Sequence, residues 1–488
     1  MGALSIDWHA ISPEVAITGA LLAVLVIDLF LPHRFKIFNA PIAFAGIAAA
    51  GICLGTLWGE HRTTFGGMFV LDNYAILFKL LFVAVGGIII LVSADYLDEH
   101  VRSMQGEFYF LLLTSLLGML IMPSAGDLIA LFVALETVSV PGFLIAGFRK
   151  PDQRGNEAAI KFFLFGVLSS AVMLFGMSLI YGVARSTNLE AIATALQGRV
   201  HDPLVFASIL LVVVGFAFKV SAVPFHFWAP DTYEGSPVPV AAFLSVASKA
   251  AGFAGLLQIC FIAFRYQTNV WAPGFAILAA LTMTVGNVVA LQQTQMVRLL
   301  AYSSIAQAGY MLLPFGVVAN QGATVQRNAF GASLTYILIY SFINLGAFAV
   351  AIAVGRAKPA NLISDYDGLG QRDPKLAIAR LVFLLGLAGM VPNVAGFFAK
   401  FVVFRAAIDG HATWLAAVMV LNTVVGLYYY LSVGARMFLR QPSDAEPVRA
   451  PVLIAAALVL LVLVVAAVSI YPELFNHFSP HSTLIAGP

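Results

Sequence analysis

Charged residues are scarce in this sequence. Only 10% of its 488 residues are Asp, Glu, Lys or Arg, and 61% are hydrophobic, with a mean hydropathy of +0.93. A typical soluble domain has about 25% charged residues. The composition therefore excludes an ordinary soluble enzyme. It predicts an all-α polytopic membrane protein, because a span needs about 20 apolar residues and the chain has many runs of that length.

Cysteines and long polar segments are also lacking. Cys53 and Cys260 both lie in predicted spans, so neither a disulfide framework nor a metal cluster is expected. His477 and His481 are four residues apart, but Pro480 lies between them, and we predict no metal site there. The longest polar stretch, about residues 355 to 376, is too short for a catalytic domain. Any nucleotide, flavin or iron–sulfur chemistry would therefore belong to other chains.

About fourteen apolar runs follow one another along the chain. Their centres lie near residues 22, 49, 83, 115, 138, 171, 216, 250, 281, 309, 342, 393, 425 and 461. Cytoplasmic loops of membrane proteins hold the excess of Lys and Arg. Fifteen such residues, including Arg380, fall after odd-numbered spans, and six fall after even-numbered spans. We therefore predict that both termini face away from the cytoplasm.

Four ionisable residues lie deep inside the predicted spans. Glu136 is nine residues past Asp127, which places it about 14 Å into a hydrocarbon core about 30 Å thick. Lys249 lies about 18 Å into its span by the same helical rise, and Lys219 and Lys400 fall well inside the long seventh and twelfth spans. An ionisable side chain at such depth costs several kcal/mol on most scales, so it usually has a function.

Two of these spans contain a proline that should interrupt the helix. Pro224 has no amide proton to donate to the carbonyl of Val220, so helix 7 should break just after Lys219. Pro392 removes the same hydrogen bond from the carbonyl of Ala388 in helix 12. Discontinuous helices of this kind mark the ion sites of transporters.

The two broken spans also resemble each other in sequence. GFAFK (215 to 219) nearly matches GFFAK (396 to 400), which suggests two structural repeats. We predict spans 1 to 3 in residues 1–106, a first repeat of spans 4 to 8 in 107–264, a second repeat of spans 9 to 13 in 265–440, and span 14 with the C-terminal tail in 441–488. Because five spans is an odd number, consecutive repeats must be inverted in the membrane.

The buried charges indicate a proton relay. Desolvation favours a neutral lysine and a nearby carboxylate favours a charged one, so moving Glu136 toward Lys219 would change which group holds the proton. A purely structural ion pair is the alternative for these two residues. Lys249 and Lys400 have no carboxylate nearby in sequence.

Several other polar residues are weaker candidates. Lys161 lies four residues after Glu157 near the start of helix 6 and either takes part in the relay or snorkels to the interface. Lys79 is expected to snorkel. His226 follows the break and could shuttle protons or serve as a hydrogen-bonded structural residue. Small polar residues in LLAYSSIAQAGY could line a hydrated path or act as helix-packing contacts; they are Tyr302, Ser303, Ser304 and Gln307.

One segment carries a resemblance to a known family. The sequence PFHFWAPDTYEGSPVPVAAFLSVASKAA (224 to 251) closely resembles the antiporter-like membrane subunits of respiratory complex I, and its PDTYEGSP part resembles the subunit N group. The resemblance continues in DLIALFVALETVSVPGFLIAGF (127 to 148), RGNEAAIKFFLFGVLSS (154 to 170) and RLLAYSSIAQAGYMLL (298 to 313).

The resemblance implies a fold and a set of residue roles. It implies fourteen helices with two inverted five-helix repeats and broken helices 7 and 12. The proton-translocating residues that it implies are Glu136 of helix 5, Lys219 of helix 7, Lys249 of helix 8 and Lys400 of the helix 12 exit path, with Lys161 and His226 as further relay positions.

The resemblance also implies where the chain works. It implies a bacterial cytoplasmic (inner) membrane, a bilayer environment, and assembly with an M-type antiporter-like subunit and small K- and J-type subunits, with no nucleic acid. This chain would bind no cofactor, whereas NADH, FMN, iron–sulfur clusters and quinone would belong to partner subunits. The alternatives are a subunit of a multisubunit Na⁺/H⁺ antiporter, a subunit of a ferredoxin-dependent photosynthetic complex, and a structural scaffold.

Overall fold

The structure is a bundle of long helices. This computed structural model describes residues 6–358, 361–391, 393–442, 448 and 450–472. The helices of the N-terminal half are α1 (Ser12–Phe30), α2 (Asn39–Thr56), α3 (Asn73–His100), α4 (Gln105–Ile121), α5 (Leu128–Ala146), α6 (Gln153–Ala184), α7 (Leu189–Leu196), α8 (Pro203–Lys219), α9 (Trp228–Gly235), α10 (Val238–Phe243) and α11 (Lys249–Gln258).

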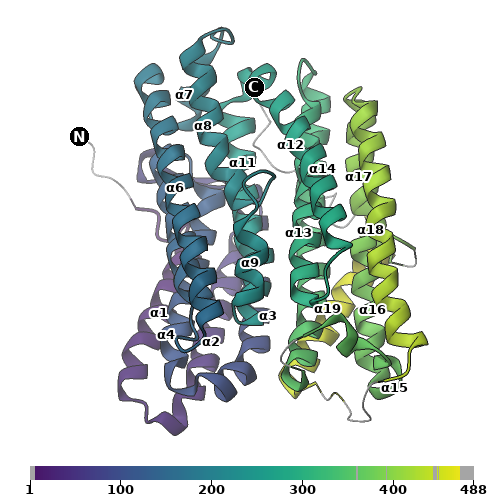
Figure 1. Ribbon diagram of the computed structural model, residues 1–488. Coiled ribbons are helices and arrows are strands. Elements are labelled where there is room, and N and C mark those ends of the chain that lie inside the picture. Colours follow the sequence, from purple (N-terminus) through teal and green to yellow (C-terminus); the bar gives the residue numbers. More distant parts are fainter. Residues whose placement is uncertain (1–5, 359–360, 392, 443–447, 449, 473–488) are drawn as a thin grey trace.

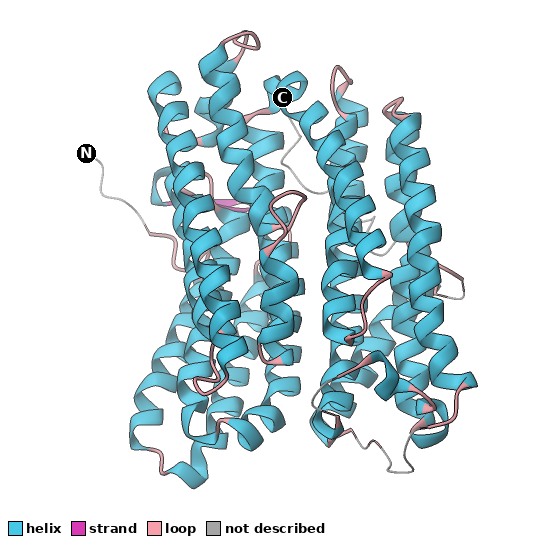
Figure 2. Ribbon diagram, viewed as in Figure 1, coloured by secondary structure: helices cyan, strands magenta, loops and turns pink. Residues whose placement is uncertain are grey.

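The remaining helices follow in the C-terminal half. They are α12 (Thr268–Ala290), α13 (Met296–Leu312), α14 (Ala323–Ala357), α15 (Leu369–Arg372), α16 (Pro374–Ala388), α17 (Val394–Asp409), α18 (Thr413–Leu439) and α19 (Val452–Ile470). One short antiparallel hairpin joins β1 (Arg62–Thr64) to β2 (Phe69–Leu71). Figure 2 shows helices along nearly all of the described chain.

The structure confirms a helical protein with many membrane-length helices. Eleven helices of the described residues are long and apolar enough to cross a bilayer, and eleven of the fourteen predicted centres fall in them. The other three centres, near 216, 309 and 393, fall on the shorter helices α8 and α13 and between α16 and α17. The predicted total of fourteen spans and the inverted repeats therefore stay predictions.

Aspartate side chains define where several of the helices begin. Asp72, Asp127, Asp152, Asp202 and Asp373 each accept a hydrogen bond from a backbone N–H in the first turn of the helix that follows. These N–H groups have no partner within the helix, and a carboxylate also interacts favourably with the positive end of the helix dipole. The N-caps hold the polar ends of apolar helices in fixed positions.

The most buried helices lie in the middle of the bundle. Every residue of the continuous helical stretch Val238–Ala263 is buried except Val238, and α14 is buried from Ala329 to Val354 except at Phe342. α14 packs against α10, α13, α16, α17 and α19. Figure 1 shows α11 beside the N-terminal helices and α13 beside the C-terminal ones. Buried polar groups on these central helices are therefore shielded from lipid.

Both predicted helix breaks are present. α8 ends at Lys219, as predicted, and Ser221 adopts a left-handed conformation (φ 60°) before α9 begins at Trp228. α16 ends at Ala388, Gly389 is left-handed (φ 73°), and α17 begins at Val394. Pro392, to which we assigned the second break, lies outside the described residues.

Two turns within the buried stretch Val238–Ala263 differ from an α-helix. Segments η5 (Leu244–Ser248) and η6 (Ile259–Ala263) are π-helical. A π-turn contains one extra residue, so it shifts the direction of the side chains that follow, and such turns often occur at functional sites. Lys249 directly follows η5. The sequence did not predict this feature, because a helix that is apolar on every side has no periodic pattern from which its phase can be read.

Candidate functional site

Lys219 is held at the end of the broken helix α8. Its side chain is 3% exposed, and its Nζ donates a hydrogen bond to Ser139 Oγ at 2.9 Å. Ser139 Oγ in turn donates to the Leu135 carbonyl at 2.7 Å. The ammonium is therefore buried inside the bundle, and the hydroxyl of a serine on α5 is its hydrogen-bond acceptor.

Glu136 lies one turn before Ser139 on the same helix. Residues three apart lie on one face of an α-helix, so the carboxylate and the hydroxyl face the same region. Glu136 Oε1 accepts a hydrogen bond from Ser170 Oγ of α6 at 2.5 Å. Glu136 and Lys219 do not form a direct ion pair, but Lys219 is bound to Ser139, one turn from Glu136 on the same helix. The predicted neighbours are thus close to each other, with Ser139 between them.

Lys249 is 1% exposed and follows the π-turn η5. Its Nζ donates to the backbone carbonyl of Ser304 at 2.8 Å and to Ser304 Oγ at 3.0 Å. Both acceptors are uncharged groups of Ser304, which belongs to α13. Lys249 therefore links the buried stretch Val238–Ala263 to the C-terminal half.

Lys400 reaches back from α17 to the break before it. Its Nζ donates to the Ala388 carbonyl at 2.8 Å and lies 4.7 Å from the centroid of the Tyr310 ring. A helix end leaves its last carbonyls without an intrahelical partner. The carbonyl that the break releases at the end of α16 is therefore the group that binds the buried ammonium.

Several polar groups lie between Lys249 and Lys400, although the hydrogen bonds among the described residues do not join them into one continuous chain. Ser304 binds Lys249. The residue before it in the sequence, Ser303, has its Oγ 2.5 Å from Tyr430 Oη. Gln307 Nε2 donates to Tyr430 Oη at 3.3 Å and to the Leu387 carbonyl at 2.9 Å. Leu387 precedes Ala388, the acceptor of Lys400. We call Ser303, Ser304, Gln307, Tyr430 and the carbonyls of residues 387 and 388 the polar path.

Two glycines give the lysine side chains their space. A Cβ atom on Gly252 would lie 2.8 Å from Lys219 Cγ, and one on Gly389 would lie 2.6 Å from Lys400 Cδ. Gly252 is on α11, three residues after Lys249. The stem of Lys219 thus packs on the helix that carries Lys249, although no hydrogen bond directly joins these two lysines.

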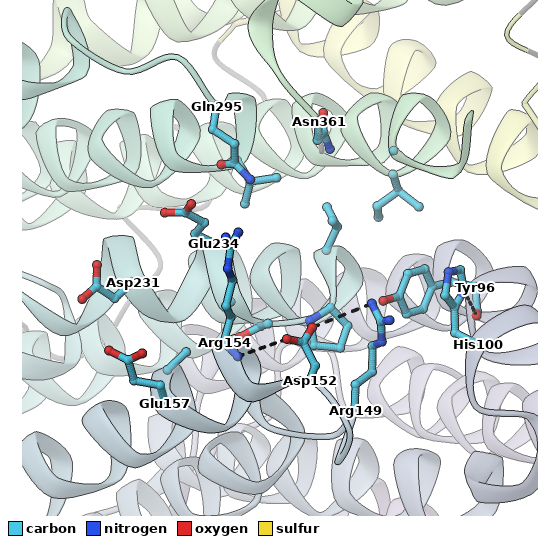
Figure 3. Close-up of a pocket in the computed structure, with 18 of the residues that line it drawn as sticks. Tyr96, His100, Arg149, Asp152, Arg154, Glu157, Asp231, Glu234, Gln295 and Asn361 are labelled. Atoms are coloured by element: carbon cyan, nitrogen blue, oxygen red, sulfur yellow. Dashed lines mark hydrogen bonds and ion pairs between the residues drawn. The ribbon is translucent and has the colours of Figure 1, made fainter. Parts of the chain in front are cut away.

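Lys161 is one of the residues that line a charged cavity of about 680 Å³. Figure 3 shows this cavity and labels Glu157, Asp231 and Glu234 among its lining residues. The Nζ of Lys161 forms ion pairs with Asp231 at 2.8 Å and Glu157 at 2.9 Å, and its side chain is 41% exposed. Arg298 pairs with the other Asp231 oxygen at 3.1 Å and with Glu234 at 2.5 Å. The cavity lies between the loops that precede α6 and α10 and the first turn of α13. Lys161 is therefore apart from the buried lysines, near a polar opening.

His226 lies in the segment between α8 and α9. It is 7% exposed, its ring is 4.6 Å from the Phe227 ring, and its Nδ1 has no hydrogen-bond partner in the described part of the chain. No hydrogen bond joins it to Lys219, Lys249 or Lys400. The structure therefore does not bring His226 into contact with the lysines that it was predicted to connect.

Two cations were misplaced by the sequence analysis. Lys79 was expected to snorkel, but its side chain is fully buried and forms an ion pair with Glu14 of α1 at 2.8 Å. Arg380 was counted among the loop cations, but it lies within α16 and is fully buried. Both errors have the same cause, because the distance of a residue from a span end does not say which helices cover it.

The serine and tyrosine partners were largely missed. Ser139, Ser170 and Tyr430 hold or surround the charged groups, but only the segment containing Ser303, Ser304 and Gln307 was marked as a possible path. The three-residue spacing between Glu136 and Ser139 could have identified Ser139, because it places both side chains on one face of the helix. In the described residues, no group of three or more His, Cys, Asp and Glu could hold a metal ion. The pair His477 and His481 lies outside the described residues.

Comparisons with known proteins agree with this arrangement. Residues 125–426 match the family described as NADH:quinone oxidoreductase/Mrp antiporter, transmembrane. NADH-quinone oxidoreductase subunit N 2 of Streptomyces griseus subsp. griseus is 44% identical over 455 residues, which cover 90% of this chain and 84% of the relative.

Solved structures have the same fold. A chain of respiratory complex I from Thermus thermophilus aligns with a TM-score of 0.78 and 31% identity, covering 95% of this chain and 98% of that one. A chain of the Mrp complex from Dietzia sp. aligns with a TM-score of 0.86, covering 99% of this chain and 98% of that one, but at 20% identity it shows the fold alone. The family match, the identity to subunit N and the buried lysines agree, and this chain belongs to the antiporter-like subunit N family of NADH-quinone oxidoreductase.

Proposed function

We propose that this subunit translocates protons through Glu136, Lys219, Lys249 and Lys400, driven by electron transfer from NADH to quinone in other subunits. The observation that carries the proposal is the polar path, whose hydroxyl, amide and carbonyl groups lie between Lys249 and Lys400. Hydroxyl groups both donate and accept hydrogen bonds, so those of Ser303, Ser304 and Tyr430 can pass a proton. The amide and carbonyl groups can only hydrogen-bond the water that would carry the proton past their positions.

Glu136 and Lys219 would start the transfer. The hydrogen bond from Lys219 to Ser139 holds the ammonium one helical turn from Glu136. A carboxylate near a buried lysine favours its charged form and desolvation favours its neutral form. A small shift of α5 relative to α8 would therefore change whether Lys219 keeps its proton. Charge movement in a neighbouring subunit could reach the polar path in this way.

Lys161 and its cavity are the proposed site of proton uptake. The cavity holds Lys161, Asp231 and Glu234 beside an opening, and Glu234 lies near the end of α9, four residues before α10 begins at Val238. Ionisable groups at a polar opening exchange protons readily with water. For His226 we propose a relay role after the break, supported by its burial and its ring nitrogen without a partner.

The assembly and orientation are part of the same proposal. We place the chain beside an M-type antiporter-like subunit and the small K- and J-type subunits, with NADH, FMN, iron–sulfur clusters and quinone bound by partners. Both termini face away from the cytoplasm, and spans 4 to 8 and 9 to 13 form inverted repeats. Each of Lys219 and Lys400 packs against a glycine near a helix break, which supports the repeats, although Lys219 precedes its break and Lys400 follows its own.

A cation/proton antiporter subunit is the second candidate, because the family model includes Mrp antiporters. The 44% identity to a subunit N chain favours the redox-driven complex. Membranes containing the chain would distinguish the two. Proton uptake that needs NADH supports the first candidate, and proton flux that needs a sodium gradient supports the second. A ferredoxin-dependent complex would show pumping with reduced ferredoxin in place of NADH.

The test uses the assembled complex in liposomes. Lys219→Ala, Lys249→Ala and Lys400→Ala should each slow proton transfer through this subunit by at least about tenfold, since positioned proton-transfer groups typically contribute 10² or more to a rate. The number of protons moved per electron should then fall by the share that this subunit carries. Lys375→Ala, at an exposed lysine of α16, is the matched control and should pump normally. Normal pumping by all three variants of the buried lysines would refute the relay.

A further inference from the structure

One face of α14 contacts the π-turn that precedes Lys249. Asn344 Nδ2 donates to Ser245 Oγ at 3.1 Å, and Tyr340 Oη donates to the Ser245 carbonyl at 3.3 Å. Ser245 lies in η5 (Leu244–Ser248), and Ser245, Tyr340 and Asn344 are all buried. Residues four apart lie on one face of an α-helix, so Tyr340 and Asn344 hold the π-turn from the same side. The proposed relay uses neither of these two residues.

The backbone of η5 explains why this turn needs a partner from another helix. In an α-helix the N–H of Lys249 would donate to the Ser245 carbonyl, four residues before it. Here that N–H donates to the Val246 carbonyl instead. The Tyr340 hydroxyl is therefore a donor for a carbonyl that has lost its α-helical partner. Because a buried carbonyl without a partner costs free energy, this hydroxyl favours the π form of η5 over the α form.

The side chain of Ser245 ties three elements together. Its Oγ donates to the Ala242 carbonyl of α10 at 3.0 Å. A hydroxyl has only one hydrogen to donate, so Ser245 Oγ must accept the hydrogen bond from Asn344 Nδ2. The other amide atom, Asn344 Oδ1, has no hydrogen-bond partner among the described residues. The contact with Ser245 thus accounts for a polar side chain at this fully buried position.

The form of η5 sets the direction of the Lys249 side chain. Each residue turns an α-helix by about 100°. If η5 wound as an α-helix, Lys249 would rotate by about that angle relative to α10, and its Nζ would move away from Ser304. In the π form, Nζ donates to the Ser304 carbonyl and hydroxyl. The same face of α14 is also fixed to the polar path, because Tyr336 Oη donates to Gln307 Oε1 at 2.5 Å.

We propose that Tyr340 and Asn344 are positioning residues that hold η5 in its π form and thereby direct Lys249 toward Ser304. This inference rests on the proposed function of the polar path. A side chain transfers a proton efficiently only to a group within hydrogen-bond reach. Without the two contacts from α14, η5 relaxes toward an α-helix and Lys249 loses its acceptors on α13. Neither Tyr340 nor Asn344 needs to take up or release a proton for this role.

The test compares proton pumping by the assembled complex in liposomes. Asn344→Leu removes the amide at similar volume, and Tyr340→Phe removes only the hydroxyl. Each should lower the number of protons moved per electron, and the double variant should fall close to the level of Lys249→Ala. Tyr366→Phe is the matched control and should pump normally. It also removes a buried tyrosine hydroxyl, one that donates to Asn361 Oδ1 at 2.8 Å.

Three measurements separate positioning from a loss of packing. Adding both α14 substitutions to Lys249→Ala should lower pumping no further, because they act through that lysine. Ser245→Ala removes the hydroxyl that Asn344 binds, so combining it with Asn344→Leu should cost no more than either change alone. A cryo-EM structure of the complex with Tyr340→Phe and Asn344→Leu should show η5 as an α-helix, with Lys249 Nζ away from Ser304.

Two conservative variants keep the test decisive if the double variant does not assemble. Tyr340→Phe and Ser245→Ala each remove a single hydroxyl. Pumping by both of them equal to that of Tyr366→Phe would overturn the proposal. A further fall in pumping when the α14 substitutions are added to Lys249→Ala would also overturn it.

Failure of this inference is distinguishable from failure of the relay. Normal pumping by Lys249→Ala would end the relay whatever the α14 variants do. Impaired pumping by Lys249→Ala, together with normal pumping by the Tyr340 and Asn344 variants, would refute only the positioning role of α14.

Discussion

At the scale of single residues, the buried lysines are held mainly by groups that carry no charge. Ser139 Oγ accepts from Lys219, the Ser304 carbonyl and hydroxyl accept from Lys249, and the Ala388 carbonyl accepts from Lys400. Such acceptors satisfy an ammonium but do not fix it in the charged form as a close carboxylate would. This leaves each lysine able to give up a proton, which a relay requires.

The positions of the four charged residues could be predicted, but their partners could not. Depth within an apolar run follows from counting residues along one helix. Ser139 lies 80 residues from Lys219, and Ser304 lies 55 residues from Lys249. Which helices become neighbours depends on the packing of the whole bundle, so these pairs have no local signal in a single sequence.

Ser139→Ala should weaken proton transfer without dismantling the subunit. It removes the acceptor of Lys219, and a hydrogen bond to a charged group contributes about 1.5–3 kcal/mol, so pumping per electron should fall by roughly tenfold. Proton uptake by the reconstituted complex measures this. Ser178→Ala, at an exposed serine on α6, is the control. Equal pumping by Ser139→Ala and the unchanged protein would show that the hydroxyl is not needed.

The Glu14–Lys79 pair should contribute to stability and not to pumping. Removing one partner of a buried ion pair costs about 3–5 kcal/mol, whereas replacing both by apolar residues is often neutral. Lys79→Met or Glu14→Leu alone should therefore lower the amount of assembled complex and its thermal transition, and the double variant should recover both. Quantitative electrophoresis and a thermal shift assay measure this. A double variant no better than the worse single one would contradict the pairing.

At the scale of elements, proline chemistry predicted the breaks, whereas the π-turns were not foreseen. Pro224 correctly indicated that α8 ends at Lys219, because a missing amide proton acts locally. The π-turn η5 before Lys249 depends on how the stretch Val238–Ala263 packs against α14, α3, α8 and its other neighbours. Features controlled by one residue's backbone are therefore readable in the sequence, and features controlled by the fit between helices are not.

The N-terminal segment should detach from the β-hairpin in acid. Arg62 binds Asp7 at 2.8 Å and Glu60 at 2.5 Å. The hydrogen bond from Arg62 lowers the pKa of Asp7 below its usual 3.8, and that from the same guanidinium lowers the pKa of Glu60 below 4.5. A lowered carboxylate pKa stabilises the contact above the ordinary pKa, and the contact is lost as the pH falls through the lowered value.

A spin label measures this detachment. Attached at Trp8→Cys in a Cys53→Ala background, it should be immobile at neutral pH and become mobile only below about pH 4, where carboxylates ordinarily titrate. Arg62→Ala should make it mobile at every pH. Unchanged mobility in Arg62→Ala would show that the ion pairs do not hold the segment.

At the scale of the whole molecule, composition predicted the class of protein and the approximate number of apolar runs. Three of the runs fall on short or interrupted helices, so length and hydropathy alone identify eleven. The distribution of Lys and Arg along the sequence also predicts the orientation of the chain in the membrane. Fifteen Lys and Arg residues were assigned to one side; Arg380 is buried, but the remaining excess over six still predicts the same orientation.

Thiol labelling tests the orientation. Gln153→Cys, at the start of α6, should react with a membrane-impermeant maleimide only after the cytoplasmic side is opened, because it lies on the Arg-rich side. Gln197→Cys, after α7, should react in intact spheroplasts. Both positions are exposed, and the unchanged protein, with Cys260 buried and Cys53 within α2, is the control. The opposite labelling pattern would reverse the proposed topology.

The absence of a Cβ atom at Gly252 and Gly389 limits how this chain can evolve. Every single-base change of a glycine codon that yields another amino acid introduces a Cβ, and here that atom would meet Lys219 Cγ at 2.8 Å or Lys400 Cδ at 2.6 Å. Gly389 also has a φ of 73°, which L-residues rarely adopt. Neither glycine can be replaced by another residue while its lysine keeps its present position. A lineage that replaced one of these glycines would have to relocate the ammonium or abandon it.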